Sequence, residues 1–234
     1  MKKNILIIGA TGSIGSRAAK LLADSGENLF LAGKNIEKLQ EVASACGVHS
    51  DRYCTVDITQ ASAIRELRDR FFKQLSSIDI LINAASIGII KPMDTLDESD
   101  FLHTLHTNLY APFLLMKTFL PVMKERKKGL IINIPGELGK VPMAGGAAYC
   151  ASKFGLVGMM QSIREELHAT DIKITNLFLG GVEQASWESL ELKVQQEKLL
   201  QTEEAVKAIW FLCQQANLGM PAEVITHTLD VPSP

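Results

Sequence analysis

The fold is decided by the stretch Ile5-Leu6-Ile7-Ile8-Gly9-Ala10-Thr11-Gly12-Ser13-Ile14-Gly15. Its first four residues form an apolar run of the length of a buried strand, and its glycines indicate a tight turn. From Ser16 to Ala23 apolar residues recur on one face, which predicts a helix. A strand, a glycine turn and a helix in this order form a dinucleotide-binding fingerprint, because glycines let the backbone approach a pyrophosphate that the helix N-terminus attracts. An ordinary tight turn is the alternative explanation.

The second predicted strand, Leu29 to Ala32, indicates which dinucleotide is bound. NAD sites carry an acidic residue near the end of this strand for the ribose 2′-hydroxyl. No Asp or Glu occupies positions 33–36, and Lys34 instead supplies a cation where a 2′-phosphate would lie. We therefore expect NADP(H) in preference to NAD(H), although a solvated loop lysine would look the same in the sequence.

Strands and helices alternate along the rest of the chain. This alternation predicts an α/β fold in which a doubly wound parallel β-sheet (a Rossmann fold) is covered on both faces, giving a three-layer αβα arrangement in one domain, 1–234. The predicted strands are 53–56, 78–82, 130–134, 172–178 and 224–229, the predicted helices are 36–46, 61–75, 108–126, 147–170 and 202–214, and a polar stretch fills 183–201.

Tyr149 and Lys153 stand four residues apart in Tyr149-Cys150-Ala151-Ser152-Lys153. On a helix, residues at this spacing share one face. A tyrosine hydroxyl can give a proton to a carbonyl oxygen or take one from an alcohol, and a fixed ammonium nearby favours the phenolate. The pair therefore predicts acid–base chemistry. A surface helix with a chance Tyr and Lys is the alternative that this pattern alone leaves open.

Composition limits the partners and the compartment. A chain of 234 residues that is 47% hydrophobic can bury a substantial core, and a net charge of −2 gives no reason to expect nucleic acid or an anionic membrane as a partner. No apolar stretch is long enough to span a bilayer. The cysteines form no CxxC pair and have no zinc-site spacing, so we expect no metal and reduced thiols in a cytoplasmic protein. They are Cys46, Cys54, Cys150 and Cys213.

Several motifs in one order make the chain resemble the short-chain dehydrogenase/reductase family over essentially its full length. The resemblance implies that Tyr149 is the acid/base, that Lys153 assists it and binds the nicotinamide ribose, and that Asn108 holds a water in the proton relay. Asp57 matches the acid that hydrogen-bonds adenine. The cofactor-binding residues implied are Gly9, Thr11, Gly12, Ser13, Ile14, Gly15, Lys34, Asp57, Ile58, Asn83, Ala84, Ala85, Tyr149, Lys153, Gly180 and Val182.

The departures from the family pattern bear on activity. The catalytic serine of the family stands thirteen residues before the tyrosine, and here that position is Gly136, which has no hydroxyl to hold a developing oxyanion. Ser13 replaces a glycine of the cofactor turn. Ser86 replaces the glycine of the segment after the fourth strand. Gln184 stands where a threonine contacts the nicotinamide amide. Together these changes predict an altered or relaxed active site.

Two functions remain open on this basis. The first is hydride transfer between the nicotinamide and a small carbonyl or secondary alcohol, and the second is an impaired NADP-binding sensor or scaffold. Restoring the hydroxyl by Gly136→Ser is the change expected to distinguish them. The resemblance also implies a homodimer or homotetramer assembled through the long helices. An apolar substrate pocket, or equally plain core, is expected from Leu138, Val141, Pro142, Met143, Leu179 and Trp187.

Overall fold

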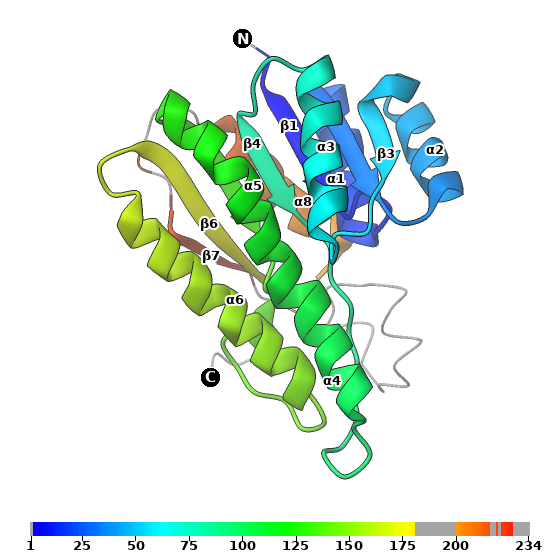
Figure 1. The fold of residues 1–234 in the computed structure, drawn as a ribbon, viewed down its shortest axis with the longest axis vertical. Helices are drawn as coiled ribbons and strands as arrows, with labels where there is room; N and C mark the ends of the chain where they lie inside the picture. Colours follow the sequence, from blue (N-terminus) through cyan, green and yellow to red (C-terminus); the bar gives the residue numbers. More distant parts are fainter. Residues whose placement is uncertain (1, 181–199, 216–218, 220, 227–234) are drawn as a thin grey trace.

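The computed structural model describes residues 2–180, 200–215, 219 and 221–226. Within them, a seven-stranded parallel sheet has the order β3-β2-β1-β4-β5-β6-β7 (Figure 1). The predicted α/β class and parallel doubly wound sheet are confirmed. The strands are β1 (Asn4–Ile8), β2 (Asn28–Gly33), β3 (Tyr53–Thr55), β4 (Ile80–Asn83), β5 (Lys128–Asn133), β6 (Asp171–Leu179) and β7 (Glu223–Thr226).

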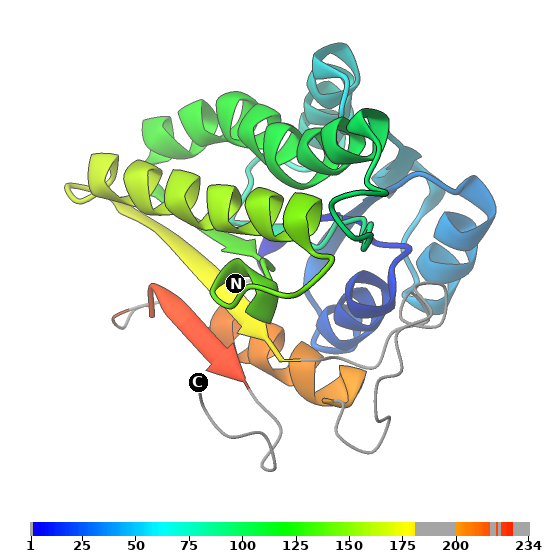
Figure 2. The ribbon, with the colours of Figure 1, turned by 90° about the horizontal axis from the view of Figure 1, so that it is seen from below.

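Helices cover both faces of the sheet (Figures 1 and 2). Alternation along β1 explains the two cores, because Leu6 and Ile8 belong to one buried cluster while Ile5 and Ile7 belong to the other. The first face carries α3 (Ala61–Gln74), α4 (Glu98–Leu105), α5 (Ala111–Arg126) and α6 (Ala147–Glu166), and the second carries α1 (Ser13–Asp24), α2 (Ile36–Ala45) and α8 (Thr202–Gln214).

The strand order reverses between β1 and β4. The chain proceeds from β1 outward to β2 and β3, then returns to β4 on the other side of β1 and continues to β7. Because parallel strands end at the same edge, the chain leaves β1 and β4 there toward helices on opposite faces of the sheet, which is the point where such sheets form a crevice. In open α/β sheets this is where ligands bind.

One predicted helix differs from the observed structure. The helix predicted over 108–126 begins earlier, as α4 at Glu98, and passes through a π-helical turn, His106–Tyr110, before α5. Glu98 and Asp100 in the first turn favour the earlier start, since acidic side chains stabilise a helix N-terminus. The π turn widens the helix at Asn108, and such turns are frequent at functional sites.

Two further findings concern the described residues alone. None of their helices is long and apolar enough to cross a membrane. None of their His, Cys, Asp and Glu side chains gather into a group that could hold a metal ion. Cys54 and Cys213 are buried free thiols, and burial raises the pKa of Cys213 to about 12.

Candidate active site

The turn after β1 is built so closely that two of its positions exclude any side chain. Gly9 has φ +79°, and a Cβ on it would lie 2.6 Å from the backbone nitrogen of Ala85. A Cβ on Gly15 would lie 2.2 Å from the carbonyl oxygen of Gly9. These glycines therefore let β1, the start of α1 and the segment after β4 meet without side chains between them.

Gly12 serves a different purpose, because its Cβ would meet only the Gly9 carbonyl oxygen, at 3.4 Å. It is the N-cap of α1 and provides no capping side chain, and the first turn of α1 has no acidic residue. The first turn of α8 has two acidic residues, Glu203 and Glu204. The α1 N-terminus thus keeps free N–H groups and an uncompensated positive dipole end, which fits a dinucleotide diphosphate.

A cleft opens at the crevice beside this turn. The side chain of Thr11 lies against Gly33 at the end of β2, where a Cβ would come within 2.9 Å of it. The cleft joins predicted cofactor residues from four segments with Ser86, which departs from the family pattern, and adds Ile87, Thr59 and Thr107, which the sequence did not indicate. Its lining is Ile8, Gly9, Thr11, Gly12, Ala32, Gly33, Lys34, Val56, Ile58, Thr59, Ala84, Ala85, Ser86, Ile87 and Thr107.

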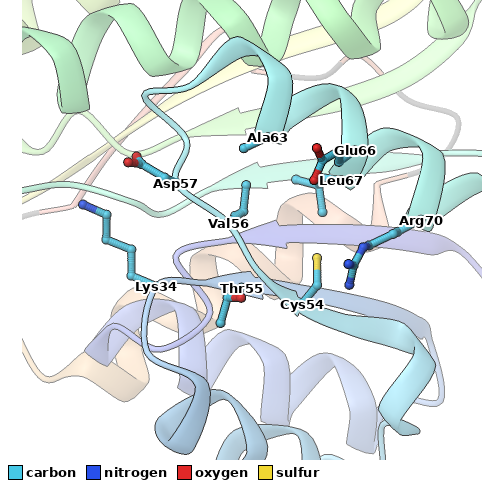
Figure 3. A pocket seen from close by; sticks show the side chains of 9 residues that line it. All are labelled: Lys34, Cys54, Thr55, Val56, Asp57, Ala63, Glu66, Leu67 and Arg70. Atoms are coloured by element: carbon cyan, nitrogen blue, oxygen red, sulfur yellow. The ribbon is translucent and has the colours of Figure 1, made fainter.

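Lys34 links this cleft to a second pocket of about 230 Å³ over β3 and α3 (Figure 3). The Lys34 amine and the Asp57 carboxylate lie at the same end of that pocket. The Thr59 hydroxyl donates to Asp57 at 2.7 Å and lowers the pKa of this carboxyl, with Lys34 adding to the effect. Arg70, at the opposite end, was missed in the sequence, although its four-residue spacing from Glu66 places both on one helix face.

Lys153 is a buried cation at the N-terminal half of α6. Its side chain is 2% exposed, and its Nζ donates to the Ile134 carbonyl oxygen at 3.2 Å and lies 5.3 Å from the centre of the Tyr149 ring. A lysine ammonium has three donors, and a buried charge needs partners for them. The described residues provide this single hydrogen bond, so Lys153 has donors left for the hydroxyls of a ribose.

Asn108 joins the loop after β4 to α6 through its side chain. Its Oδ1 accepts from the Ile87 N–H at 2.9 Å and the Ser86 hydroxyl at 3.3 Å, while its Nδ2 donates to the Ile87 carbonyl at 2.8 Å and to Ser152 Oγ at 3.1 Å. The Ser152 hydroxyl in turn donates to the Tyr149 carbonyl at 2.7 Å. The amide has no capacity left for a water, so a relay water must bind another group.

The turn after β5 contains Gly136, whose backbone has φ +71° and ψ 175°. Among the described residues other than its two chain neighbours, the one atom within 4 Å of a Cβ placed there is the Leu179 carbonyl oxygen, at 3.9 Å, but the conformation is one that only glycine adopts readily. Lys140 holds the end of this turn by pairing with Glu223 on β7 and lying 4.5 Å from the Phe178 ring centre. The predicted gain from Gly136→Ser is therefore opposed by backbone strain.

Six residues were expected to line an apolar pocket or to belong to the core. Leu179 belongs to the core, in the cluster beneath α8. Leu138, Val141 and Met143 are half-buried in the turn, and Pro142 is exposed. Gly180 is described, with its N–H bonded to the Thr226 carbonyl at 2.8 Å. Val182, Gln184 and Trp187 lie outside the described residues.

Comparisons with known proteins agree with this geometry. A family model described as "short chain dehydrogenase" matches residues 3–195. The NADP-dependent 3-hydroxy acid dehydrogenase YdfG of Salmonella typhi is 27% identical over 97% of this chain and 93% of its own. The 3-oxoacyl-[acyl-carrier-protein] reductase FabG of Rickettsia conorii is 33% identical over 85% of this chain and 80% of its own.

Solved structures show the same fold. A metagenomic short-chain oxidoreductase in complex with NADP has a TM-score of 0.81 at 27% identity, covering 96% of both chains. An alcohol dehydrogenase from the archaeon Thermococcus sibiricus, complexed with 5-hydroxy-NADP, has a TM-score of 0.89 at 20% identity and covers both chains completely.

Proposed function

This chain belongs to the short-chain dehydrogenase family, and on that premise we propose that it is an NADP(H)-dependent oxidoreductase acting on a small carbonyl compound or secondary alcohol. The observation that carries the proposal is Lys153, a buried ammonium beside the Tyr149 ring with donors to spare. Such a charge is expensive to bury without a ligand or a catalytic use. The NADP dependence of YdfG and the complex of the metagenomic oxidoreductase with NADP support the choice of cofactor.

In the proposed mechanism, the bound nicotinamide supplies or accepts the hydride. The α1 N-terminus would hold the diphosphate of the cofactor, and Lys34 would supply the cation for a 2′-phosphate. Tyr149 transfers a proton between its hydroxyl and the substrate oxygen. Lys153, oriented by the Ile134 carbonyl, holds the ribose and favours the phenolate between transfers. Asn108 fixes the start of α6 through Ser152.

The test is a fluorescence titration with NADPH and with NADH, followed by a panel of ketones and dicarbonyls added to the saturated complex. We expect tighter NADPH binding and oxidation of NADPH on at least one carbonyl. Tyr149→Phe should reduce turnover by about 10²–10⁴-fold while leaving NADPH affinity within about threefold. Tyr53→Phe on β3 serves as the matched control and should retain turnover. Equal loss in both variants would contradict the role of Tyr149.

The choice of cofactor has a separate test at Lys34. Removing one charge-assisted contact to a partly exposed phosphate should cost about tenfold in NADPH affinity and leave NADH affinity unchanged. Lys117→Ala, on the exposed side of α5, is the control. An equal loss for both dinucleotides would show that Lys34 does not select the 2′-phosphate.

A second candidate function, an NADP sensor or scaffold with little turnover, is favoured by one observation. Gly136 offers no hydroxyl, and its φ of +71° disfavours any residue that would supply one. Tight NADPH binding with no oxidation across the carbonyl panel would favour this function over the enzyme.

The predicted homo-oligomer also remains a proposal. Its support is a set of exposed aromatic side chains on the helices expected to form the interface: Tyr110 at 43%, Phe113 at 42% and Phe154 at 44%. Light scattering on the purified protein would measure the mass, and a monomer at micromolar concentration would contradict the proposal.

A further inference from the structure

Three asparagines form a row across the carboxyl edge of the sheet. Asn83 ends β4, Asn133 ends β5, and Asn176 lies in β6 beside Asn133. Parallel register pairs Asn83 with Asn133 and Asn133 with Asn176. We call these three residues the asparagine row. All are buried, with side chains 3%, 0% and 0% exposed.

The row faces α5 and α6, which follows from the alternation of side chains along a strand. Leu81, Ile131 and Ile174, each two residues before one of the asparagines, belong to the core cluster that includes Leu156 and Met160 of α6. Lys153 precedes Leu156 by three residues and Met160 by seven, so it lies on the same buried face of α6. The row and Lys153 therefore share the space between sheet and helix near the carboxyl edge.

The protein does not satisfy the hydrogen-bonding groups of the row. One bond is present, from Asn83 Nδ2 to Asn133 Oδ1 at 3.3 Å. Asn83 Oδ1, Asn133 Nδ2 and both polar atoms of the Asn176 amide have no hydrogen-bond partner in the part of the chain that the structure describes. Each unsatisfied buried polar atom costs about 1–3 kcal/mol, so four in one place would consume much of the typical total stability of about 5–15 kcal/mol.

We propose that the asparagine row binds ordered water beneath Lys153 and thereby positions the Lys153 ammonium. Buried waters typically make about three hydrogen bonds to polar groups that lack protein partners. Ile134, whose carbonyl oxygen accepts from Lys153, directly follows Asn133, so the row and the acceptor of Lys153 move together. The Asn108 side chain already makes four hydrogen bonds, whereas the asparagine row contributes four of the buried side-chain atoms that lack a partner among the described residues.

Hydration of the row is tested without any substrate. A crystal structure of the full chain at about 1.5 Å resolution should show water within hydrogen-bonding distance of Asn133 Nδ2 and of the Asn176 amide. The direction in which Asn176→Leu shifts the unfolding midpoint is an independent test of hydration. If the row is hydrated, the variant loses hydrogen bonds and the midpoint falls; if the row is dry, removal of an orphaned amide raises it. A dry row or a raised midpoint overturns the proposal.

Positioning of Lys153 is tested by a double-mutant cycle on NADPH affinity. This part of the proposal rests on the proposed function. Asn176→Leu should weaken NADPH binding at least about threefold in the native background and have no effect in the Lys153→Met background, because the two act through one contact. An equal effect of Asn176→Leu on NADPH affinity in both backgrounds would show that Asn176 has only a structural role. That result would overturn the proposal that the row positions Lys153.

The control is Thr226→Val on β7, which removes another orphaned buried hydroxyl away from Lys153 and should leave NADPH affinity unchanged in both backgrounds. Should the protein bind neither dinucleotide, the proposed function fails and positioning of Lys153 for a ribose fails with it. The water sites and the unfolding midpoint would still decide whether the row is hydrated.

Discussion

The turn after β1 and the turn after β5 both leave the carboxyl edge of the sheet, and each depends on glycine for a different reason. In the first, close contact requires glycine, since a Cβ on Gly9 or Gly15 would overlap backbone atoms, and Gly9 has a φ of +79° as well. In the second, no described atom outside the two chain neighbours lies closer than 3.9 Å to a Cβ on Gly136, so the positive φ alone requires glycine there. A turn without space for side chains can offer a ligand only backbone groups, whereas a turn limited only by its φ can accept a side chain at the cost of strain.

The largest expected effect comes from adding a side chain to the turn after β1. Gly15→Ala would place a Cβ 2.2 Å from the Gly9 carbonyl oxygen, so α1 or the turn must shift. We expect a loss of at least about 3 kcal/mol in the free energy of unfolding, at the upper end of overpacking effects, with loss of dinucleotide binding. Urea unfolding and NADPH titration measure both. Near-native stability would contradict the contact argument.

Gly136→Ala tests the second turn. The φ of +71° should cost about 1–3 kcal/mol although nothing obstructs the methyl group. Gly158→Ala in α6 is the matched control, because its Cβ also meets nothing within 4 Å but the residue is helical. It should stabilise by about 0.5–1 kcal/mol. If both variants are stabilised, the backbone of Gly136 does not require glycine.

Gly12→Ala separates ligand binding from folding within the first turn. Its Cβ would lie 3.4 Å from the Gly9 carbonyl, so we expect a change in unfolding free energy within about 1 kcal/mol. Dinucleotide affinity should fall by about tenfold or more, because the methyl group would project where the diphosphate approaches the α1 N-terminus. Unchanged NADPH affinity would remove Gly12 from the site.

The smallest effect concerns the pairing that holds the second turn. The Lys140 ammonium, with Gln161, holds the pKa of Glu223 below its usual range. A carboxyl with a lowered folded pKa stabilises above its unfolded pKa and loses that contribution as pH falls through the folded value. Lys140→Met should therefore lower the free energy of unfolding at pH 7 by less than about 1 kcal/mol, because the pair is partly exposed. At about pH 3 the substitution should leave the free energy of unfolding unchanged.

Lys117→Met, on the exposed side of α5, is the control for that pH comparison. A difference between Lys140→Met and the native protein that persists undiminished at about pH 3 would show that the contribution of Lys140 comes from its contact with the Phe178 ring instead of from Glu223.

Much of the first half was predictable from sequence because local spacing encodes it. Strand, glycine turn and helix between Ile5 and Ala23 were confirmed. The chain from the π turn onward was less predictable. The π turn at Asn108 and the backbone of Gly136 depend on contacts between segments distant in the chain, which no local pattern contains.

The sequence by itself determined the α/β class, the parallel sheet, the family and the candidates Tyr149 and Lys153, because period, turn residues and motif order are local properties. Only the tertiary structure decided that Lys153 is buried against Ile134, that the Asn108 amide is fully bonded, and that three asparagines align across β4, β5 and β6. Burial and hydrogen-bond partners arise when distant segments pack, so they follow from the assembled sheet and helices.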